Sequence, residues 1–509
     1  MIFKLQKLGL SSKFINIIKS MYSNVTAKVK LKEGLTDSFP IQVGTRQGCN
    51  LSPTLFNLFI NDLPEQFTDN KCDSITLNNE LINCVMYADD LVLLSRSESG
   101  MHTCLTKLTD YCNKWRLTIN IRKTKVIVIN GHKNKTYAFK IHNKKLETVS
   151  SFCYLGIDIS NNGSFKLAID NLHLKASKAY YSLRKEFNFH NNTSPKVILK
   201  LFESMIQPIL TYGSEIWAIF GWRFNSVQCI TNYLLKAKHK FESLHSKMCR
   251  NVLGVHNKST EILVKAELGR YPLILNILVN IFTYWQHILQ QTEHSLLYTA
   301  IKHLIDEVKL GRDNYINRIH CLFKTLECSE FLNKIQKSSI ATAKLKIKTK
   351  YKLVYNNYFF NILEDKASHD SRGRFNIYCQ VKKQYAFEQY LLLDKNKLRR
   401  NITNIRISTH NLPIELHRKH NVKKEDRLCM LCNMKEIGTE FHSLMQCTNP
   451  QIVELRQSLN TSICKTLPLW NDLNDECKFL YLTHASDKAC NFYFAIFLDK
   501  IYKKHKTSS

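Results

Sequence analysis

The chain has 509 residues, 44% of them hydrophobic, and its 73 Lys and Arg against 42 Asp and Glu give a net charge of +31. This length and composition exclude a disordered protein and allow two to four domains with buried cores. So large a positive charge indicates either a polyanionic partner or simply a soluble basic protein. The 22 Tyr and 27 Phe favour nucleic acid, because aromatic rings stack on bases.

The cysteines and the N-terminal residues indicate the cellular compartment in which the protein is expected. The 17 cysteines are scattered in apolar runs, and the first residues show no signal-peptide cleavage pattern. Reduced thiols and an intracellular, non-secreted protein are therefore expected. The most apolar window, residues 273–285, is too short to cross a bilayer, so no membrane partner is expected.

The first 43 residues predict helices followed by a strand pair. Residues 1–24 have helical apolar spacing, with Ser11 or Ser12 as the cap. The apolar face of this helix is expected to consist of Phe14, Ile17, Ile18 and Met21. Strands are predicted over residues 27–31 and 38–43, with a turn at Glu33-Gly34.

The next stretch reads Gly44-Thr45-Arg46-Gln47-Gly48-Cys49-Asn50-Leu51-Ser52-Pro53. Ser52 is predicted to be an N-cap, with Pro53 as the first residue of a helix that ends at Pro64. One interpretation is an ordinary loop before a capped helix. The other is a backbone that approaches a ligand, since Gly44 and Gly48 lack side chains while Arg46 and Gln47 offer donors to phosphates or base edges.

Two adjacent carboxylates stand at the tip of a predicted hairpin, in Tyr87-Ala88-Asp89-Asp90. The apolar runs on either side, 84–86 and 91–94, predict two buried strands. Asp is common in tight turns for local hydrogen bonding alone. Two negative charges beside buried strands are otherwise unfavourable, and a bound divalent cation would offset them. The stretch therefore indicates either a plain turn or a metal site for phosphoryl transfer.

Downstream of the hairpin, residues 105–115 predict a helix, and Asn120-x-x-Lys123 leads into a strand over 126–129. Lys123 could be functional or a plain surface lysine. Residues 152–156 form a short apolar turn, and Asn162-Gly163 predicts a hairpin.

Residues 165–290 predict mostly helices. The lysines of a helix over 167–183 form either a solvated face or a basic strip that could follow a duplex. Another helix is predicted over 195–205, ending before Pro208. Residues 344–352 alternate Lys with apolar residues, as in a strand or a basic linker. A basic cluster is expected from Lys397, Arg399, Arg400 and Arg406.

The last motif is Cys429-x2-Cys432-x9-His442-x4-Cys447. Three thiols and one imidazole form a tetrahedral Zn²⁺ set, although ordinary buried thiols remain an alternative among 17 cysteines. The hydrophilic loop between the two halves favours a knuckle closed by metal, because so small a module has little core of its own.

Taken in order, these blocks resemble the reverse transcriptases of LINE-type (non-LTR) retrotransposons. Residues 44–56 resemble the block that contacts template and nucleotide, 87–90 the metal-binding carboxylate block, and 120–123 the block near the leaving pyrophosphate. Residues 152–156 resemble the primer grip, the run 206–217 (IQPILTYGSEIW) resembles the thumb, and the Cys/His set resembles the C-terminal zinc knuckle.

The resemblance implies RNA-directed DNA polymerisation with Mg²⁺ or Mn²⁺, with an RNA template and a DNA primer supplied by retrotransposon RNA and target DNA. It implies Asp89 and Asp90 as metal ligands and Lys123 beside the pyrophosphate. Contacts to template, nucleotide or primer are implied for Arg46, Gln47, Gly48, Tyr87, Tyr154, Leu155 and Gly156. Such a protein is expected in the nucleus or in a cytoplasmic ribonucleoprotein.

One departure from the family pattern bears on activity. The aromatic-x-Asp block that carries the family's other metal-binding aspartate would lie just before the first helix, and Met1 stands where that block would end. We therefore expect an N-terminally truncated chain without fingers or endonuclease, and with weak or absent catalysis. One alternative is a non-catalytic RNA- or DNA-binding remnant or a domesticated protein. Another is an intron maturase, although the zinc set argues against it.

The fold expected is α+β. Residues 1–150 would form a partial palm of antiparallel sheet and helices, and 151–290 the primer grip and helical thumb. A basic helical or linker region is expected over 291–400, a CCHC zinc-knuckle-like module over 401–460, and a C-terminal tail over 461–509.

Overall fold

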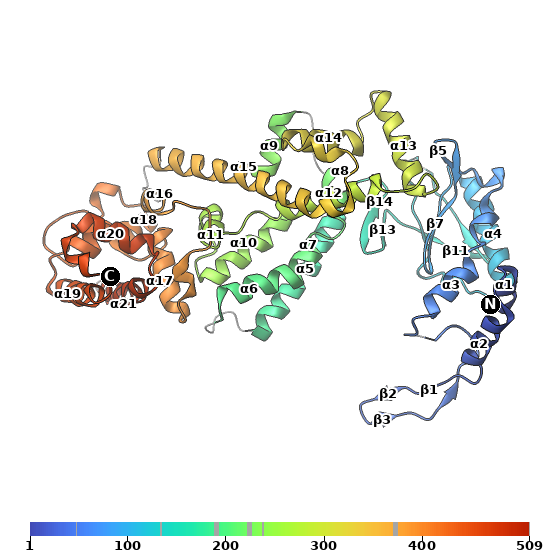
Figure 1. Ribbon diagram of the computed structural model, residues 1–509, viewed down its shortest axis with the longest axis horizontal. Coiled ribbons are helices and arrows are strands. Elements are labelled where there is room, and N and C mark those ends of the chain that lie inside the picture. The colour runs from blue at the N-terminus through green and yellow to red at the C-terminus, as the bar shows by residue number, and fades with distance from the viewer. Residues whose placement is uncertain are drawn as a thin grey trace. The chain divides into compact units, whose positions relative to one another are not determined.

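A computed structural model describes residues 1–46, 48–132, 135–187, 193–220, 226–236, 239–369 and 375–507. Figure 1 shows many helices and small two-stranded sheets, in keeping with the expected α+β class. The chain divides into two compact units. The first comprises Met1–Phe152, Ser160–Gly163 and Glu293–Asp306, and the second comprises Cys153–Ile159, Ser164–Thr292 and Glu307–Ser509.

The first unit holds the sheets. Its helices are α1 (Ile2–Lys7), α2 (Ser12–Tyr22), α3 (Ser52–Ile60), α4 (Glu98–Trp115) and most of α13 (Leu296–Lys309). Its strands are β1 (Thr26–Ala27), β2 (Lys30–Leu31), β3 (Gly34–Leu35), β4 (Phe39–Pro40), β5 (Ile75–Leu77), β6 (Glu80–Ile82), β7 (Cys84–Tyr87), β8 (Asp90–Leu93), β9 (Lys125–Val126), β10 (Lys140–Ile141), β11 (Lys144–Lys145) and β12 (Glu147–Thr148). The pairs β1–β4, β2–β3, β5–β6, β7–β8 and β10–β11 are antiparallel, and β9–β12 is parallel.

The N-terminal helix pair is confirmed, but its buried face was predicted only in part. Ser11 caps α2 by accepting a hydrogen bond from the Phe14 amide at 3.3 Å. Ile15 and Ile18 are buried against Leu5 and Leu55, whereas Phe14 and Ile17 are exposed. The face is rotated by about one residue because α1 and α3 cover that side of the helix.

The loop before α3 corrects another prediction. Ser52 is the first residue of α3, and Leu51 is its N-cap. The Ser52 hydroxyl donates to the Arg46 carbonyl at 2.7 Å and contacts the Tyr22 hydroxyl at 3.1 Å. Its side chain therefore closes the preceding loop instead of capping the helix.

The second unit is helical except for the hairpin of β13 (Ser151–Tyr154) and β14 (Ile157–Ser160), whose tip belongs to it. Its helices are α5 (Lys166–Phe187), α6 (Pro195–Leu201), α7 (Gln207–Leu210), α8 (Ser214–Phe220), α9 (Val227–Leu235), α10 (Lys240–Leu253), α11 (Glu261–Glu267), α12 (Ile274–Leu289), α14 (Tyr315–Thr325), α15 (Ile340–His369), α16 (Asn376–Val381), α17 (Asn396–Arg406), α18 (Pro413–Lys419), α19 (Pro450–Cys464), α20 (Asp475–His484) and α21 (Lys488–Thr507). None of the helices in the described ranges combines the length and apolarity needed to cross a bilayer.

Two local predictions for the stretch after β14 are wrong. Asn162-Gly163 does not make a hairpin; with Gly163 at φ +70, it turns the chain from β14 into α5. The helix over 195–205 does not end before Pro208 either. A π-helical turn, Phe202–Ile206, connects α6 to α7, which contains Pro208. The wider turn absorbs the missing N–H and the ring clash that a proline brings to an α-helix.

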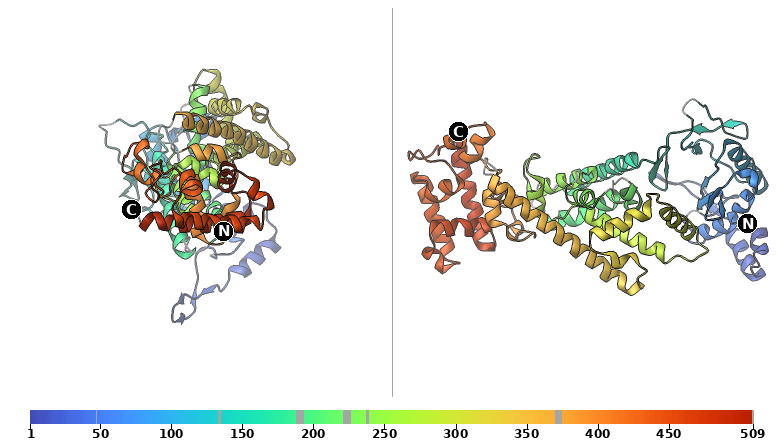
Figure 2. Two further views of the ribbon diagram at one scale, coloured as in Figure 1. Left: turned by 90° about the vertical axis from the view of Figure 1, so that its left-hand side faces the viewer. Right: turned by 90° about the horizontal axis from the view of Figure 1, so that it is seen from above.

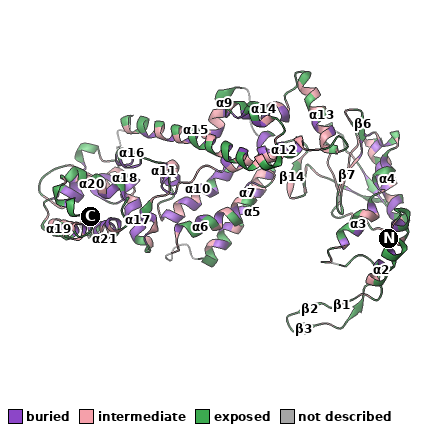
Figure 3. Ribbon diagram, in the orientation of Figure 1, coloured by how far each residue is buried: buried purple, intermediate pink, exposed green. Residues whose placement is uncertain are grey.

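Residues 344–352 belong to the long helix α15 and form neither a strand nor a linker. Its buried residues recur every fourth position, which is the helical period, and are Ala343, Ile347, Tyr351, Tyr355, Phe359 and Leu363. Figure 3 shows the buried and exposed colours alternating along this helix. The lysines fill the remaining positions, so the local Lys–apolar alternation resembles a strand without being one.

The C-terminal helices α17 to α21 pack on one another, as the orange and red ribbons of Figure 2 show. Within the stretch 461–509, expected as a tail, residues 461–507 are folded, with Trp470, Phe494 and Leu498 fully buried. The basic cluster predicted just before the last motif is divided between surface and core, and its members Lys397 and Arg400 are exposed. Arg399 and Arg406 are buried, and Arg406 forms ion pairs with Glu267 and Glu388 at 3.0 Å.

Candidate active site and metal cluster

The hairpin of β7 and β8 carries the paired carboxylates at its tip. Tyr87 pairs with Asp90, and the two-residue turn between them is Ala88-Asp89. Cys84 pairs with Leu93 and Met86 with Leu91. These four side chains pack on a core that is built from α4 and from residues between 63 and 72. Successive side chains alternate between the faces of a strand. Tyr87 and Asp90 therefore lie on the face opposite this core.

The strands were predicted to be buried, but they are only half-buried, because a single face has a partner. Asp89 and Asp90 are both exposed, and Tyr87 is 66% exposed. Within the part of the chain that the structure describes, neither carboxylate has a hydrogen bond or ion pair. Ala88 has φ +52, a left-handed conformation that costs a non-glycine residue about 1 kcal/mol. Such strain is common where a turn must present particular side chains.

The loop over 44–52 is partly described. Gly44 and Gly48 have φ of +96 and +79, and nothing lies within 4 Å of the position that a Cβ would take at either one. Both glycines are thus required by backbone conformation and leave open space beside the loop. The Arg46 guanidinium lies over the Tyr22 ring, 5.8 Å from its centroid. Gln47, predicted as a donor, lies outside the described residues.

Lys123 sits in a tight turn that Asn120 stabilises. The Lys123 amide donates to the Asn120 side-chain oxygen at 3.2 Å and to its carbonyl at 3.1 Å. The Lys123 side chain is exposed. Among the described residues, no hydrogen bond or ion pair joins Lys123 or Arg46 to either aspartate, so these candidate site residues share the unit without direct contacts.

The amino-acid sequence of this unit matches a known family. Residues 1–159 match the family described as Reverse transcriptase (RNA-dependent DNA polymerase). Residues 1–159 belong to the reverse transcriptase family. The relatives place this reverse transcriptase region among those of non-LTR retrotransposons.

Three relatives illustrate the similarity. The chain is 22% identical over 209 residues to the RNA-directed DNA polymerase from mobile element jockey of Drosophila melanogaster, covering 40% of this chain and 22% of that protein. It is 25% identical over 251 residues to the probable RNA-directed DNA polymerase from transposon BS of the same species, covering 47% and 26%. It is 26% identical over 222 residues to the Pol polyprotein from type-1 retrotransposable element R2 of Popillia japonica, covering 42% and 30%. The similarity thus spans under a third of each of these relatives.

The residues predicted to form a primer grip lie at the tip of β13–β14. Leu155 and Gly156 form the turn, with φ of +47 and +86, and Leu155 is 39% exposed. Tyr154 is half-buried at the end of β13. The tip groups with the helical unit, whereas Asp89, Asp90, Arg46 and Lys123 belong to the other unit.

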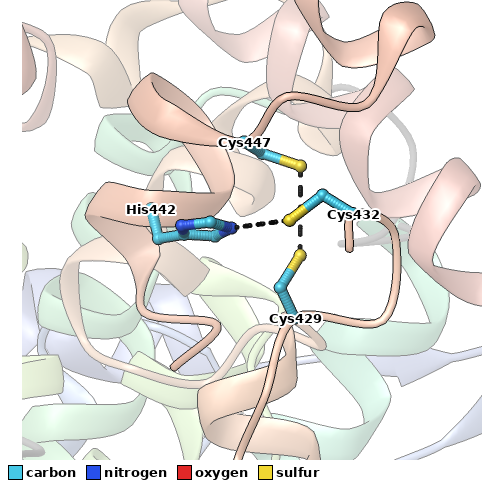
Figure 4. A group of neighbouring side chains, drawn as sticks. All are labelled: Cys429, Cys432, His442 and Cys447. Carbon is cyan, nitrogen blue, oxygen red and sulfur yellow. Dashed lines mark hydrogen bonds between the residues drawn. The ribbon is translucent and has the colours of Figure 1, made fainter. Parts of the chain in front are cut away.

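The four metal-ligand candidates beyond the reverse transcriptase region come together (Figure 4). One ligand atom from each of Cys429, Cys432, His442 and Cys447 lies within 4.8 Å of the others. Cys429 Sγ is 3.9 Å from Cys447 Sγ, and Cys432 Sγ is 3.4 Å from His442 Nε2. His442 Nδ1 lies 2.9 Å from a Glu436 carboxylate oxygen. Because a carboxylate accepts, Nδ1 carries the proton and Nε2 offers its lone pair to the cluster.

The cluster also favours thiolate chemistry. The hydrogen bond between the Cys429 and Cys447 thiols lowers the pKa of Cys429 and raises that of Cys447, so one of the pair ionises readily. The motif is not a free-standing module. Arg456 of α19 donates to the Cys447 carbonyl at 2.9 Å, and a Cβ on Gly438 would lie 2.6 Å from Pro413 of α18.

Sequence reasoning missed two features. Lys4 of α1 is buried, with Nζ 4.0 Å from the Trp115 ring centroid, 2.6 Å from Asp62 and 2.7 Å from the Tyr111 hydroxyl. A lysine in an amphipathic helix gives no signal that it is buried. Tyr212, inside the block that resembles the thumb, contacts the turn of the β13–β14 hairpin at Leu155. The block was recognised as a sequence, but only the fold could show what it touches.

Proposed function

We propose that this chain acts as part of an RNA-directed DNA polymerase of a non-LTR retrotransposon. The observation that carries the proposal is the β7–β8 tip, which holds Asp89 and Asp90 exposed within the region that matches the family. One face of the hairpin is anchored on a core, so the tip presents both carboxylates from a fixed base. Carboxylate oxygens are the ligands that Mg²⁺ and Mn²⁺ prefer, so the residues present fit a divalent cation.

The reaction would be nucleotidyl transfer to a primer. The 3′ hydroxyl of the DNA primer attacks the α-phosphorus of the incoming nucleotide. A new O–P bond forms while the bond between the α-phosphorus and the pyrophosphate oxygen breaks, and the hydroxyl proton passes to water. Divalent cations supply stabilisation of the entering and leaving oxygens in this chemistry. Asp89 and Asp90 would hold the cation, and Lys123 would neutralise or protonate the departing pyrophosphate.

The substrates proposed are an RNA template and a DNA primer. The net charge of +31 favours a polyanion of this kind. Arg46, Gln47 and Gly48 would contact the template or nucleotide. The open space beside the backbone at Gly44 and Gly48 would let a substrate approach closely.

Tyr87, two-thirds exposed beside Asp90, would pack on the nucleotide. The turn of Tyr154, Leu155 and Gly156 would hold the primer end, and a protein of this kind would act in the nucleus or in a ribonucleoprotein.

For the 509-residue chain by itself, we propose weak catalysis or none. Two neighbouring carboxylates can hold one cation, whereas the reaction uses two cations about 3.5–4 Å apart, with further ligands. Binding of template and primer would persist, because it depends on basic and aromatic side chains spread over the chain. A nucleic-acid-binding protein without polymerase activity is the second candidate function, and the Cys/His cluster favours it.

A binding and extension assay tests the proposal. The purified chain is mixed with a labelled DNA primer on an RNA template. Binding is then measured over a range of salt concentrations from about 50 to about 300 mM, which brackets the physiological ionic strength. We expect a steep fall of affinity with salt, together with little extension. Indifference to salt would contradict the nucleic-acid role, and efficient extension would overturn the proposed weakness of catalysis.

Cation binding at the tip is measured separately by Mn²⁺ electron paramagnetic resonance. We expect the double variant Asp89→Asn, Asp90→Asn to lose the Mn²⁺ that the unaltered chain holds, since neutral amides are poorer ligands. The matched control is Asp110→Asn, which removes one exposed carboxylate from α4 in the same unit. Equal Mn²⁺ binding by the double variant and the control would exclude the tip as the cation site.

We also propose that Cys429, Cys432, His442 and Cys447 bind one Zn²⁺. Three sulfur atoms and one imidazole nitrogen make a donor set of the structural type, and bound zinc would tie the loop to its helices. We expect one zinc per chain by elemental analysis, lost in Cys432→Ser and retained in Cys464→Ser, a half-buried cysteine of α19. A metal-free preparation with unchanged fold and unchanged RNA affinity would contradict the role of zinc.

A further inference from the structure

The tip of the β13–β14 hairpin adopts a conformation that its sequence does not favour. Leu155 and Gly156 both have positive φ, +47 and +86, as in the mirror-image turns that close tight hairpins. Asn or Gly usually occupies the first of these positions, because a Cβ there crowds the following carbonyl. Leu155 therefore needs support from outside the hairpin to remain left-handed.

Tyr212 provides this support. Its hydroxyl donates to the Leu155 carbonyl at 2.8 Å, and its ring carbon Cε1 lies 3.2 Å from where a Cβ on Gly156 would be. The Tyr212 side chain thus holds Leu155 through a hydrogen bond, and its ring covers the side of Gly156 on which a Cβ would lie. Any larger residue at 156 would meet the ring as well as an unfavourable φ.

The segment that carries Tyr212 is itself held in place. Trp217, which is 1% exposed, donates from Nε1 to the Tyr212 carbonyl at 2.8 Å. Gly213 has φ +64, and a Cβ there would lie 2.9 Å from the Ile157 side chain of β14. Asn280 of α12 donates to the Ser214 hydroxyl at 3.0 Å. Contacts thus run from a helix of the second unit, through the turn over 211–214, to the hairpin tip.

We propose that Tyr212 is a positioning residue, which fixes the hairpin tip so that the tip can seat the 3′ end of a DNA primer on its RNA template. The role rests on the proposed function, because a fixed orientation of the tip matters only if the tip binds the primer. Tyr212 acts through Leu155 and Gly156 and not on the reacting atoms. The exposed Leu155 side chain, aimed by the Tyr212 hydrogen bond, is the surface that would contact the primer end.

The test uses the full chain and two measurements. Hydrogen–deuterium exchange reports the mobility of residues 153–159, and binding is compared between an RNA–DNA hybrid with a recessed primer 3′ end and a blunt hybrid. We expect Tyr212→Phe, which keeps the ring but removes the hydroxyl, to speed exchange at the tip about fivefold, the effect of one lost hydrogen bond. We expect a fall of about the same size in the preference for the recessed end.

The matched control is Tyr271→Phe, which also removes a tyrosine hydroxyl of the second unit, hydrogen-bonded at 2.9 Å to Asn356. It should change neither measurement. Tyr212→Phe behaving like the control, or speeding exchange without changing the preference, would overturn the positioning role. A loss of preference seen only in Tyr212→Ala would assign the positioning to the ring and overturn the role of the hydroxyl. An unaltered chain that binds neither hybrid contradicts the proposed function, while exchange at the tip still decides whether Tyr212 holds the turn.

Discussion

At the scale of single residues, buried charges stabilise the helical unit through partners far apart in the chain. Glu242 and His245 of α10 meet Lys265 of α11: His245 Nδ1 lies 3.1 Å from a Glu242 oxygen, and Lys265 Nζ lies 2.7 Å from the same oxygen. Phe202 stacks on the imidazole from the other side. Burial, together with the positive charges of Lys265 and Arg270, lowers the pKa of His245 to about 4, although Glu242 acts in the opposite direction.

This shift predicts a loss of stability in mild acid. The unfolded chain has a histidine pKa of about 6.5, so between pH 4 and 6.5 it binds more protons than the folded chain, and folding stability falls as the pH falls through this window. The shift corresponds to about 3 kcal/mol at most. Hydrogen exchange of the α10 amides in increasing denaturant measures the free energy of unfolding. This free energy should depend less on pH in His245→Gln than in the unaltered chain. Equal dependence would rule out this histidine as the cause.

Predictions for single residues succeeded where a local rule determines the structure. They failed where a residue far away in the sequence determines whether a side chain is buried. The Asp89 turn followed from its apolar flanks, and Ser11 as a cap followed from its place before the helix. Arg406 was expected in a basic cluster, but Glu267, 139 positions earlier, makes a buried ion pair with it. Nothing in the neighbourhood of Arg406 in the sequence indicates that partner.

At the scale of elements, α15 shows why the period of a pattern matters more than its local alternation. Over 344–352 the sequence repeats at every second residue, but the buried residues follow each other every fourth. Leu345 is 64% exposed, whereas Ile347, two residues later, is fully buried. In a strand these two side chains would share one face, and in a helix they point in nearly opposite directions.

The two residues give a matched pair of substitutions. Ile347→Ala should lower the free energy of unfolding by about 2–5 kcal/mol, because it leaves a cavity in a packed interior. Leu345→Ala should change it by less than about 0.5 kcal/mol, since the side chain has little packing to lose. Urea denaturation followed by circular dichroism measures both. Similar losses from the two substitutions would contradict the helical placement of this segment.

At the scale of the whole molecule, the units are not continuous stretches of sequence. The hairpin tip over 153–159 groups with the helical unit, and residues 293–306 return to the unit that contains most of the reverse transcriptase region. The sequence supported the order of blocks and the α+β class, because each block has its own local signature. Which distant segment completes which unit depends on packing, and no local pattern shows it.

The return of α13 has a consequence that can be measured. Thr299 and Ile301 are buried, and the Thr299 hydroxyl donates to a Glu80 carboxylate oxygen of β6 at 3.0 Å. Ile301→Asp would place an unpaired charge in this buried position and should release the helix. We expect faster hydrogen exchange over β5 and β6, at residues 75–82, without change in α12 or α15. Ile305→Asp, one turn later and 40% exposed, is the control. If exchange over 75–82 stays slow in Ile301→Asp, α13 does not stabilise the β5–β6 hairpin.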